Sequence, residues 1–224
     1  MQLPSKSLGR SFVLARGVPI IVAIILLVAP TPLHAQASAG QVYKSQINTV
    51  NRGLGGNAAK GTAEFRITGD ELLITVNAEG LSPDMMHLMH VHGFADGKKA
   101  ACATMRADTH KDGIVDVIEA MSVNGPEIIP LNKNPQDINI KSPTYPKSSK
   151  QGTLQYSTKI PLKGLQQNMQ KKFGLAALNL ENMVINIHGV DKKAKLPASV
   201  KSEMKLPAYQ TVPVACGQIK RAQP

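Results

Sequence analysis

Short runs in which apolar and polar residues partly alternate recur along the chain and predict β-strands. Successive side chains of a strand point to opposite faces of a sheet, so ELLITVNA at 71–78 has the pattern of a strand with one buried face. The Gly69-Asp70 pair in front of it is typical of a hairpin turn between two strands. The segments with strand-like patterns are 41–50, 61–68, 71–78, 153–161, 182–189 and 208–219.

Two segments depart from the strand pattern. Leu165, Met169 and Phe173 recur at four-residue spacing, which predicts a short helix over 163–173. Residues 122–151 are rich in Pro, Asn, Ser and Lys and predict a long loop inserted in the domain. Many short strands joined by Gly-, Pro- and Asn-rich turns indicate an all-β fold, an antiparallel sandwich or barrel with long loops and one short helix.

The N-terminal segment has the three parts of a secretory signal peptide. Residues 1–16 carry three basic residues and no acidic one, 17–30 form an apolar run, and Ala35-Gln36-Ala37 offers the small residues of a cleavage site. The apolar run is too short for a membrane-spanning helix, which needs about 20 residues. We therefore predict a signal peptide over 1–37 and an exported domain over 38–224, located in a periplasm or outside the cell.

The exported domain is basic and poor in aromatic residues. The net charge of the chain is +11, and it falls to +8 when the three basic residues of the predicted signal are removed. Many lysines lie between 141 and 205 and predict a solvated face that favours contact with anionic surfaces. Aromatic residues make up 4% of the chain and Trp is absent, which argues against base stacking and so against nucleic acid as a partner.

Cys102 and Cys216 are the only cysteines in the sequence. In an oxidising compartment an even pair of cysteines predicts one disulfide. This disulfide would join the middle of the chain to its C-terminal end. Two free thiols are the alternative.

Three histidines, His87, His90 and His92, fall within six residues. If 85–94 forms a strand, His90 and His92 point to the same face, and two imidazoles at that spacing can bind one metal ion. Imidazole is a suitable ligand for copper and for zinc. His87 would face the other side, with a structural role or a role in supporting the ligands. The alternative is that the pair only forms the polar face of an edge strand.

Three blocks of the sequence resemble the copper/zinc superoxide dismutases. MHLMHVHGFADG (86–97) resembles the first copper-ligand strand of that family, in which a His-x-x-His-x-His group leads into a Phe/Gly/Asp turn. MVINIHGVD (183–191) resembles the strand that carries another copper ligand. VACGQI (214–219) resembles the C-terminal strand, whose cysteine closes a disulfide back to the loop after the histidine strand.

This resemblance implies a fold, a metal and a substrate. The fold is a Greek-key β-sandwich with the metal site on its flank. The metal is copper, with His90, His92 and His188 as ligands, and the substrate is superoxide. The resemblance also implies a disulfide between Cys102 and Cys216.

The sequence departs from the family in two places. The region after the first cysteine, where the family has a bridging histidine and further zinc ligands, contains only His110. His110 is therefore the only candidate for a fourth copper ligand, and a zinc site is not expected. Pro213 stands where the family has an Arg that guides superoxide to the copper, so weaker electrostatic focusing of that anion is expected.

Residues 108–119, DTHKDGIVDVIE, follow the spacing of an EF-hand calcium loop except that His110 stands at the third position. Calcium prefers oxygen ligands, and His110 cannot serve copper and calcium together. Gly113 would supply the sharp turn of such a loop. A plain acidic turn is the alternative. The candidate oxygen ligands of calcium are Asp108, Asp112, the Ile114 carbonyl, Asp116 and Glu119.

Three functions are compatible with these observations. The first is an exported, copper-dependent superoxide dismutase or a close relative. The second is a non-catalytic binder of copper or calcium on the same fold, and the third is a structural or interaction module that has lost the chemistry. His188 argues against the third, because an inactive site has no reason to keep a separate third imidazole. We rank the three in this order, with the first two close.

Overall fold

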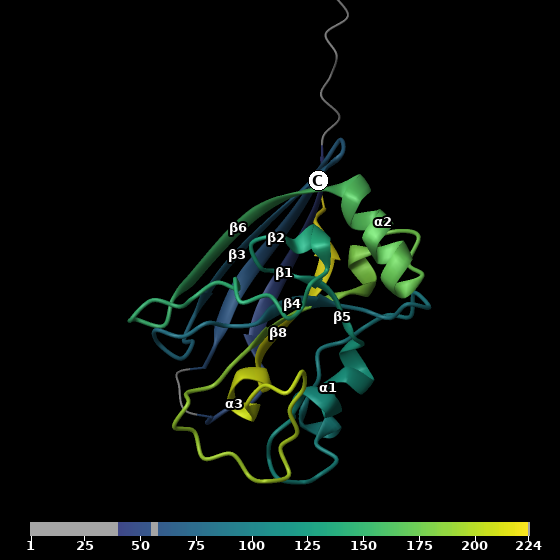
Figure 1. Ribbon diagram of the computed structural model, residues 1–224. Coiled ribbons are helices and arrows are strands. Elements are labelled where there is room, and N and C mark those ends of the chain that lie inside the picture. The colour runs from purple at the N-terminus through teal and green to yellow at the C-terminus, as the bar shows by residue number, and fades with distance from the viewer. Residues whose placement is uncertain (1–39, 55–57, 224) are drawn as a thin grey trace, which may run out of the picture. The chain divides into compact units, whose positions relative to one another are not determined.

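The computed structural model describes residues 40–54 and 58–223, so the predicted signal peptide lies outside the described residues. One eight-stranded antiparallel sheet forms the described domain, which confirms the predicted all-β fold (Figure 1). The strand order is β5-β4-β7-β8-β1-β2-β3-β6. The strands are β1 (Gln41–Thr49), β2 (Lys60–Thr68), β3 (Glu71–Glu79), β4 (Met89–His92), β5 (Glu127–Pro130), β6 (Leu154–Pro161), β7 (Val184–His188) and β8 (Pro213–Arg221).

The helices among the described residues are short and lie between the strands. α2 (Leu162–Phe173) confirms the predicted helix and buries Leu165 and Met169 against the core. α1 (Val117–Asn124) and α3 (Ala208–Thr211) complete the α-helices of this part of the chain. Within 40–54 and 58–223, no helix has both the length and the apolar character that crossing a membrane requires.

The structure contains more regular elements between β3 and β6 than the sequence pattern predicts. β4 keeps only four residues of the histidine-rich run, and β5 lies inside 122–151, which we expected to be one long loop. α1 begins where the pattern of 108–119 suggests a calcium loop. The Asp116 carboxylate caps this helix by accepting hydrogen bonds from the backbone N–H groups of Ile118 and Glu119.

The long strands β1, β2, β3 and β6 lie side by side and bury one face (Figure 1). Ile47, Phe65 and Ile74 point inward and are fully buried, which places the main core on this face. Residues between them, such as Gln46 and Asn77, point outward and are exposed. This half of the sheet therefore follows the alternation that the sequence shows.

β4 and β7, in contrast, are buried on both faces. Val91 and Ile187 point into the main core. The alternate residues of both strands point to the outer face, which is covered by the loops that follow them in the chain. This covered outer face carries the histidines that the sequence singles out.

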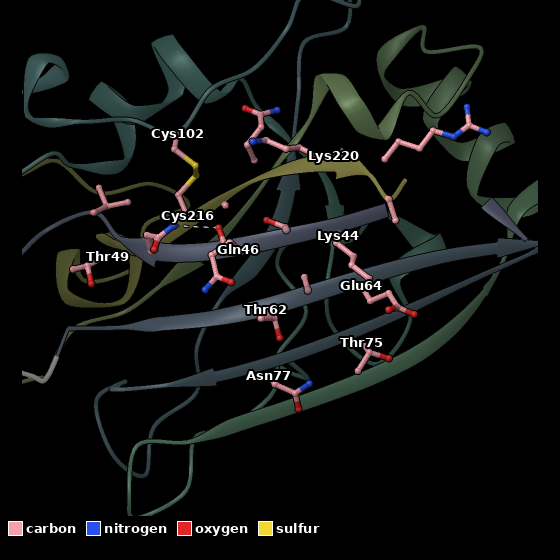
Figure 2. A pocket seen from close by; sticks show the side chains of 18 of the residues that line it. Lys44, Gln46, Thr49, Thr62, Glu64, Thr75, Asn77, Cys102, Cys216 and Lys220 are labelled. Carbon is pink, nitrogen blue, oxygen red and sulfur yellow. Dashed lines mark hydrogen bonds between the residues drawn. A yellow bond between two sulfur atoms is a disulfide. The ribbon is translucent and has the colours of Figure 1, made fainter. Parts of the chain in front are cut away.

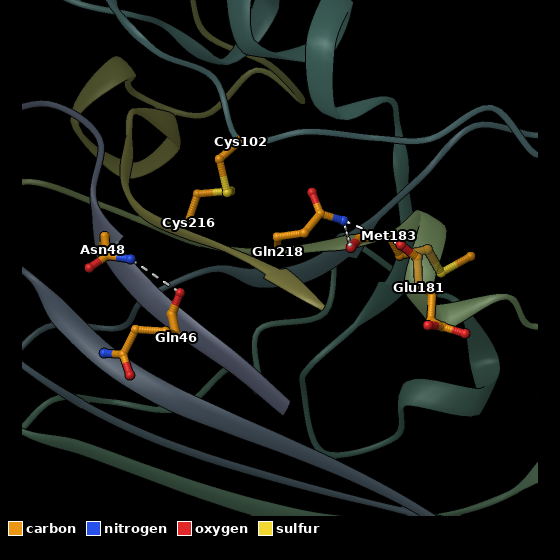
Figure 3. The surroundings of a disulfide bond; sticks show 7 residues. All are labelled: Gln46, Asn48, Cys102, Glu181, Met183, Cys216 and Gln218. Atoms are coloured by element: carbon orange, nitrogen blue, oxygen red, sulfur yellow. Dashed lines mark hydrogen bonds between the residues drawn. A yellow bond between two sulfur atoms is a disulfide. The ribbon is translucent and has the colours of Figure 1, made fainter. Parts of the chain in front are cut away.

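The two cysteines form the predicted disulfide, which ties the loop after β4 to β8 (Figure 3). Cys102 and Cys216 are 114 positions apart in the sequence, and their Cα atoms are 5.6 Å apart. Cys216 is buried and packs with Ala100 and Val184 on the outer face of the sheet. The disulfide therefore fastens the loop between β4 and α1 over that face.

Candidate metal centre

His90, His92 and His188 gather into one buried group on the outer face of the sheet, hereafter the histidine trio. β4 supplies the first two from alternate positions, and the neighbouring strand β7 supplies the third. Their side chains are at most 2% exposed, and their ring centroids lie 5.4–5.7 Å apart. One ring nitrogen of each lies within 4.8 Å of those of the other two, so the group can bind a single metal ion.

A backbone carbonyl fixes the ring of two members of the trio. His92 Nδ1 lies 2.9 Å from the Gly125 carbonyl oxygen, and His188 Nδ1 lies 2.8 Å from the Thr211 carbonyl oxygen. A carbonyl oxygen only accepts, so each Nδ1 carries the proton and donates it. The Nε2 atoms of His92 and His188 are therefore left with free lone pairs.

A tyrosine fixes the third ring in the opposite sense. His90 Nε2 lies 2.7 Å from the Tyr145 hydroxyl oxygen, and that hydroxyl donates to the Ile140 carbonyl oxygen at 3.1 Å. The single hydroxyl proton of Tyr145 is thus in use, so His90 Nε2 must donate to the tyrosine oxygen. His90 Nδ1 is left with the free lone pair.

The three free nitrogens have no hydrogen-bond partner although they are buried. A buried polar atom without a partner costs about 1–3 kcal/mol, so native structures rarely leave several together. Hydrogen bonds on the opposite ring nitrogen are the usual way in which proteins hold metal-binding histidines in place. The trio therefore meets the requirements of a metal site in its donor atoms, its tautomers and its unsatisfied lone pairs.

The environment also keeps the trio neutral, which is the form that binds metal. Burial lowers the pKa of His92 to about 4. Burial and the neighbouring His92 lower the pKa of His188 to about 3. Burial, together with the other two rings, holds the pKa of His90 well below the ordinary value of 6.5. All three imidazoles are thus neutral at neutral pH, each with one N–H and one free lone pair.

His87 and His110 lie outside the trio. His87 is buried, with Nδ1 2.9 Å from the His188 carbonyl oxygen and Nε2 3.1 Å from the Ser82 carbonyl oxygen. His87 thus contacts the backbone of a trio member and holds β7 against the segment before β4. His110 forms a separate group with Asp116 and Glu119, so the structure does not bring it to the trio as a fourth ligand.

Glu119 organises the loop in which the sequence suggests calcium. Its Oε1 accepts from the backbone N–H groups of Thr109 and His110 and lies 2.8 Å from His110 Nδ1, while its Oε2 accepts from the Asp116 N–H. Although burial opposes it, these hydrogen bonds lower the pKa of Glu119 to about 2. Glu119 thereby holds the loop together through its own carboxylate.

The remaining carboxylates of this loop also face backbone groups. Asp108 accepts from the N–H groups of Asp112 and Gly113, and Asp112 accepts from the N–H of Ile114. The Ile114 side chain is buried in the core. Calcium binding at Asp108, Asp112, Ile114, Asp116 and Glu119 stays a prediction, while these contacts already give the four carboxylates a role in folding the loop.

The structure adds neighbours of the trio that the sequence pattern does not reveal. Glu127 on β5 pairs with His92 in the strand ladder, and it lies close enough to Glu203 to affect the pKa of that carboxyl group. Burial and the charge of Glu127 raise the pKa of Glu203 to about 7. Pro213, at the position where a guiding Arg is expected, lies buried and opposite His188. An acidic residue therefore pairs with one trio member in the ladder, and position 213 supplies no positive charge.

A groove lies away from the trio, on the polar outer face of the long strands. This groove has a volume of about 970 Å³, and its lining includes Gln46, Thr62 and Asn77 with the disulfide at one end (Figure 2). Lys44 and Lys220 also line it and face each other across β1 and β8. The lining includes no member of the trio, so the groove and the metal centre are separate features.

A comparison with protein-family models and with curated proteins finds no match for this chain. A functional assignment therefore rests on the geometry of the trio and on the three sequence blocks that resemble the superoxide dismutases.

Proposed function

We propose that this protein is an exported copper-binding protein related to the copper/zinc superoxide dismutases, and that the trio holds one copper ion. The observation that carries the proposal is the convergence of three buried lone pairs, His90 Nδ1, His92 Nε2 and His188 Nε2, none of which has a partner. Each comes from a neutral ring whose other nitrogen has a hydrogen-bond partner. Such rings are held in orientation and offer their free nitrogen to a metal.

The donor set favours copper over the other ions considered. Three imidazoles and no oxygen ligand do not suit calcium, which prefers carboxylate and carbonyl oxygens. Imidazole suits both copper and zinc, and at a given site divalent copper binds more tightly than zinc. The sequence resemblance also assigns the residues of the trio to copper and leaves the family's zinc loop without a counterpart.

Superoxide dismutation is the first candidate activity. Bound copper supplies one-electron chemistry, in which one superoxide is oxidised to O₂ and a second takes that electron and two protons to give H₂O₂. Burial keeps the three imidazoles in the neutral form. The protein also holds them in one orientation through Gly125, Thr211 and Tyr145. Fixed ligands reduce the rearrangement that accompanies each change in copper charge.

Non-catalytic copper binding is the second candidate, and the charges near the trio favour it. Glu127 pairs with His92 in the strand ladder, and Pro213 offers no positive charge opposite His188. Acidic groups attract a metal cation and repel superoxide. The choice between the two candidates depends on turnover and not on metal binding.

The test is copper stoichiometry followed by superoxide decay, measured on the full chain as exported. The wild type should bind one copper per chain, and His90→Ala/His92→Ala should bind none at the trio. His110→Ala is the matched control, because His110 lies outside the trio, and it should keep the copper. Absence of copper from the wild type after reconstitution would overturn the proposal. If the protein binds copper but superoxide decays no faster than in buffer without protein, the non-catalytic candidate is selected.

A further inference from the structure

Asn186 occupies a central place on the outer face of the sheet. It lies on β7 two residues before His188, so both side chains point to the same face. In the strand ladder Asn186 pairs with His90 on one side and with Cys216 on the other. Side chains of directly paired residues have Cβ atoms about 4.5–5.5 Å apart. Asn186 therefore lies between the trio and the disulfide.

Both polar atoms of the Asn186 side chain are buried without a partner. Asn186 is 1% exposed, and neither its Oδ1 nor its Nδ2 has a hydrogen bond. In the described part of the chain, eight buried side-chain atoms lack a partner, and five of them belong to the trio and Asn186. A single metal ion accounts for the three imidazole nitrogens, but it leaves the amide of Asn186 unexplained.

A small polar molecule beside the metal would satisfy this amide. Buried amides in native structures are paired with protein groups or ordered water, so a doubly unpaired amide indicates a bound partner. The amide can donate from Nδ2 to an anion and accept at Oδ1 from a water molecule. Asn186 is uncharged, so it can offer this donor in a buried place where a lone cation would be costly.

We propose that Asn186 is a positioning residue that binds a small polar molecule, water or a small anion, next to the metal held by the trio. This inference rests on the proposed function and deepens it. If the protein is a dismutase, Asn186 orients superoxide by a short-range hydrogen bond, in place of long-range attraction by an Arg at position 213. If the protein only stores copper, the same amide holds a water molecule at the metal.

The first arm of the test uses azide as the probe anion on the copper-loaded chain. Asn186→Val removes both polar atoms and keeps a residue suited to a strand. This variant should keep one copper per chain. It should weaken azide binding roughly tenfold or more, because a hydrogen bond to a charged group is lost. The azide-to-copper absorption band measures the azide affinity. Val184→Ala is the matched control, since Val184 lies on the same face of β7 and offers no polar atom. It should leave azide affinity unchanged.

The second arm needs neither a variant nor copper. A high-resolution crystal structure of the metal-free wild type should show an ordered water within hydrogen-bond distance of the Asn186 amide. If the amide instead bonds to a protein group, the inference is wrong. Equal azide affinity in wild type and Asn186→Val at equal copper content would also overturn it.

The two arms separate this inference from the proposed function. A wild type that takes up no copper refutes the proposed function, and the metal-free structure then decides whether Asn186 holds a small polar molecule. If Asn186→Val does not fold, two measurements on the wild type decide the inference. One is an azide titration of the copper-loaded protein, which measures whether azide displaces the bound water, and the other is the metal-free crystal structure. An amide with no ordered molecule in that structure counts against it.

Discussion

The long-strand region and the short-strand region of this domain differ in what their sequences reveal. β1, β2, β3 and β6 bury one face and expose the other, so their polar residues point to solvent and need no protein partner. β4 and β7 are buried on both faces, so every polar residue they carry must have a hydrogen-bond partner or stay unpaired at a cost in free energy. The unpaired nitrogens of the trio lie in this second region. The long strands thus supply most of the core, while the short strands carry the candidate metal site.

Removal of the disulfide should have the largest effect of the changes considered, and it tests how the two regions are joined. Cys102→Ser/Cys216→Ser should lower the free energy of unfolding by up to roughly 5 kcal/mol, because a long loop is released in the unfolded chain. It should also lower copper affinity, because the loop held by Cys102 leads to Gly125, which fixes His92. Denaturant unfolding and copper titration measure both effects. Unchanged values of both would contradict the role given to the disulfide.

A core substitution in the long strands should separate stability from metal binding. Phe65→Ala removes a fully buried ring from β2 and should cost about 3–5 kcal/mol of stability. The copper affinity of the folded fraction should stay within about a factor of two of the wild-type value, because none of these long strands supplies a ligand. A parallel fall in copper affinity at temperatures where the variant is folded would show that the two regions are not independent.

Low pH should weaken the short-strand region in the metal-free protein. An exposed histidine has a pKa of about 6.5, whereas His92 titrates at about 4 in the folded state because it is buried. Between these values the unfolded chain binds more protons than the folded one, so stability falls as the pH decreases. For His92 alone the loss is about 3 kcal/mol by pH 4. Urea unfolding at several pH values should show this fall in the free energy of unfolding as the pH decreases. His92→Leu should make the fall smaller.

The smallest expected effect concerns the tyrosine that orients one ligand. Tyr145→Phe removes the hydroxyl that accepts from His90 Nε2 and should lower copper affinity about tenfold, with little change in stability. Tyr156→Phe is the matched control, because its hydroxyl donates to the Asn132 carbonyl and not to the trio. Equal loss of affinity in both variants would mean that the bond to His90 has no specific role.

The difference between the two regions also explains what the sequence could predict. Alternation marks β1, β2, β3 and β6 because one face is exposed, and His90 and His92 stand out because they are two apart on one strand. Glu127 and Tyr145 are not recognisable in this way, since tertiary contacts alone bring them to the trio. Only the position of Asn186, two residues before His188, could have indicated that both side chains share a face.

The acidic run at 108–119 shows what sequence spacing cannot establish without knowledge of the contacts in the folded chain. Its spacing fits a calcium loop, and the same carboxylates serve equally well to cap α1 and to close the turn before it. Backbone N–H groups and calcium ions both bind to carboxylate oxygens, so the residue types cannot distinguish the two roles. The hydrogen bonds of the folded chain show the capping and turn-closing role, while calcium binding stays a prediction.

The most direct test of the account is electron paramagnetic resonance of the protein loaded with one equivalent of Cu(II). We expect a single copper environment with hyperfine coupling to the nitrogens of three imidazoles, and loss of one of these nitrogens in His188→Ala. A spectrum of oxygen-coordinated copper, or one that His188→Ala leaves unchanged, would contradict the assignment of the trio as the metal centre.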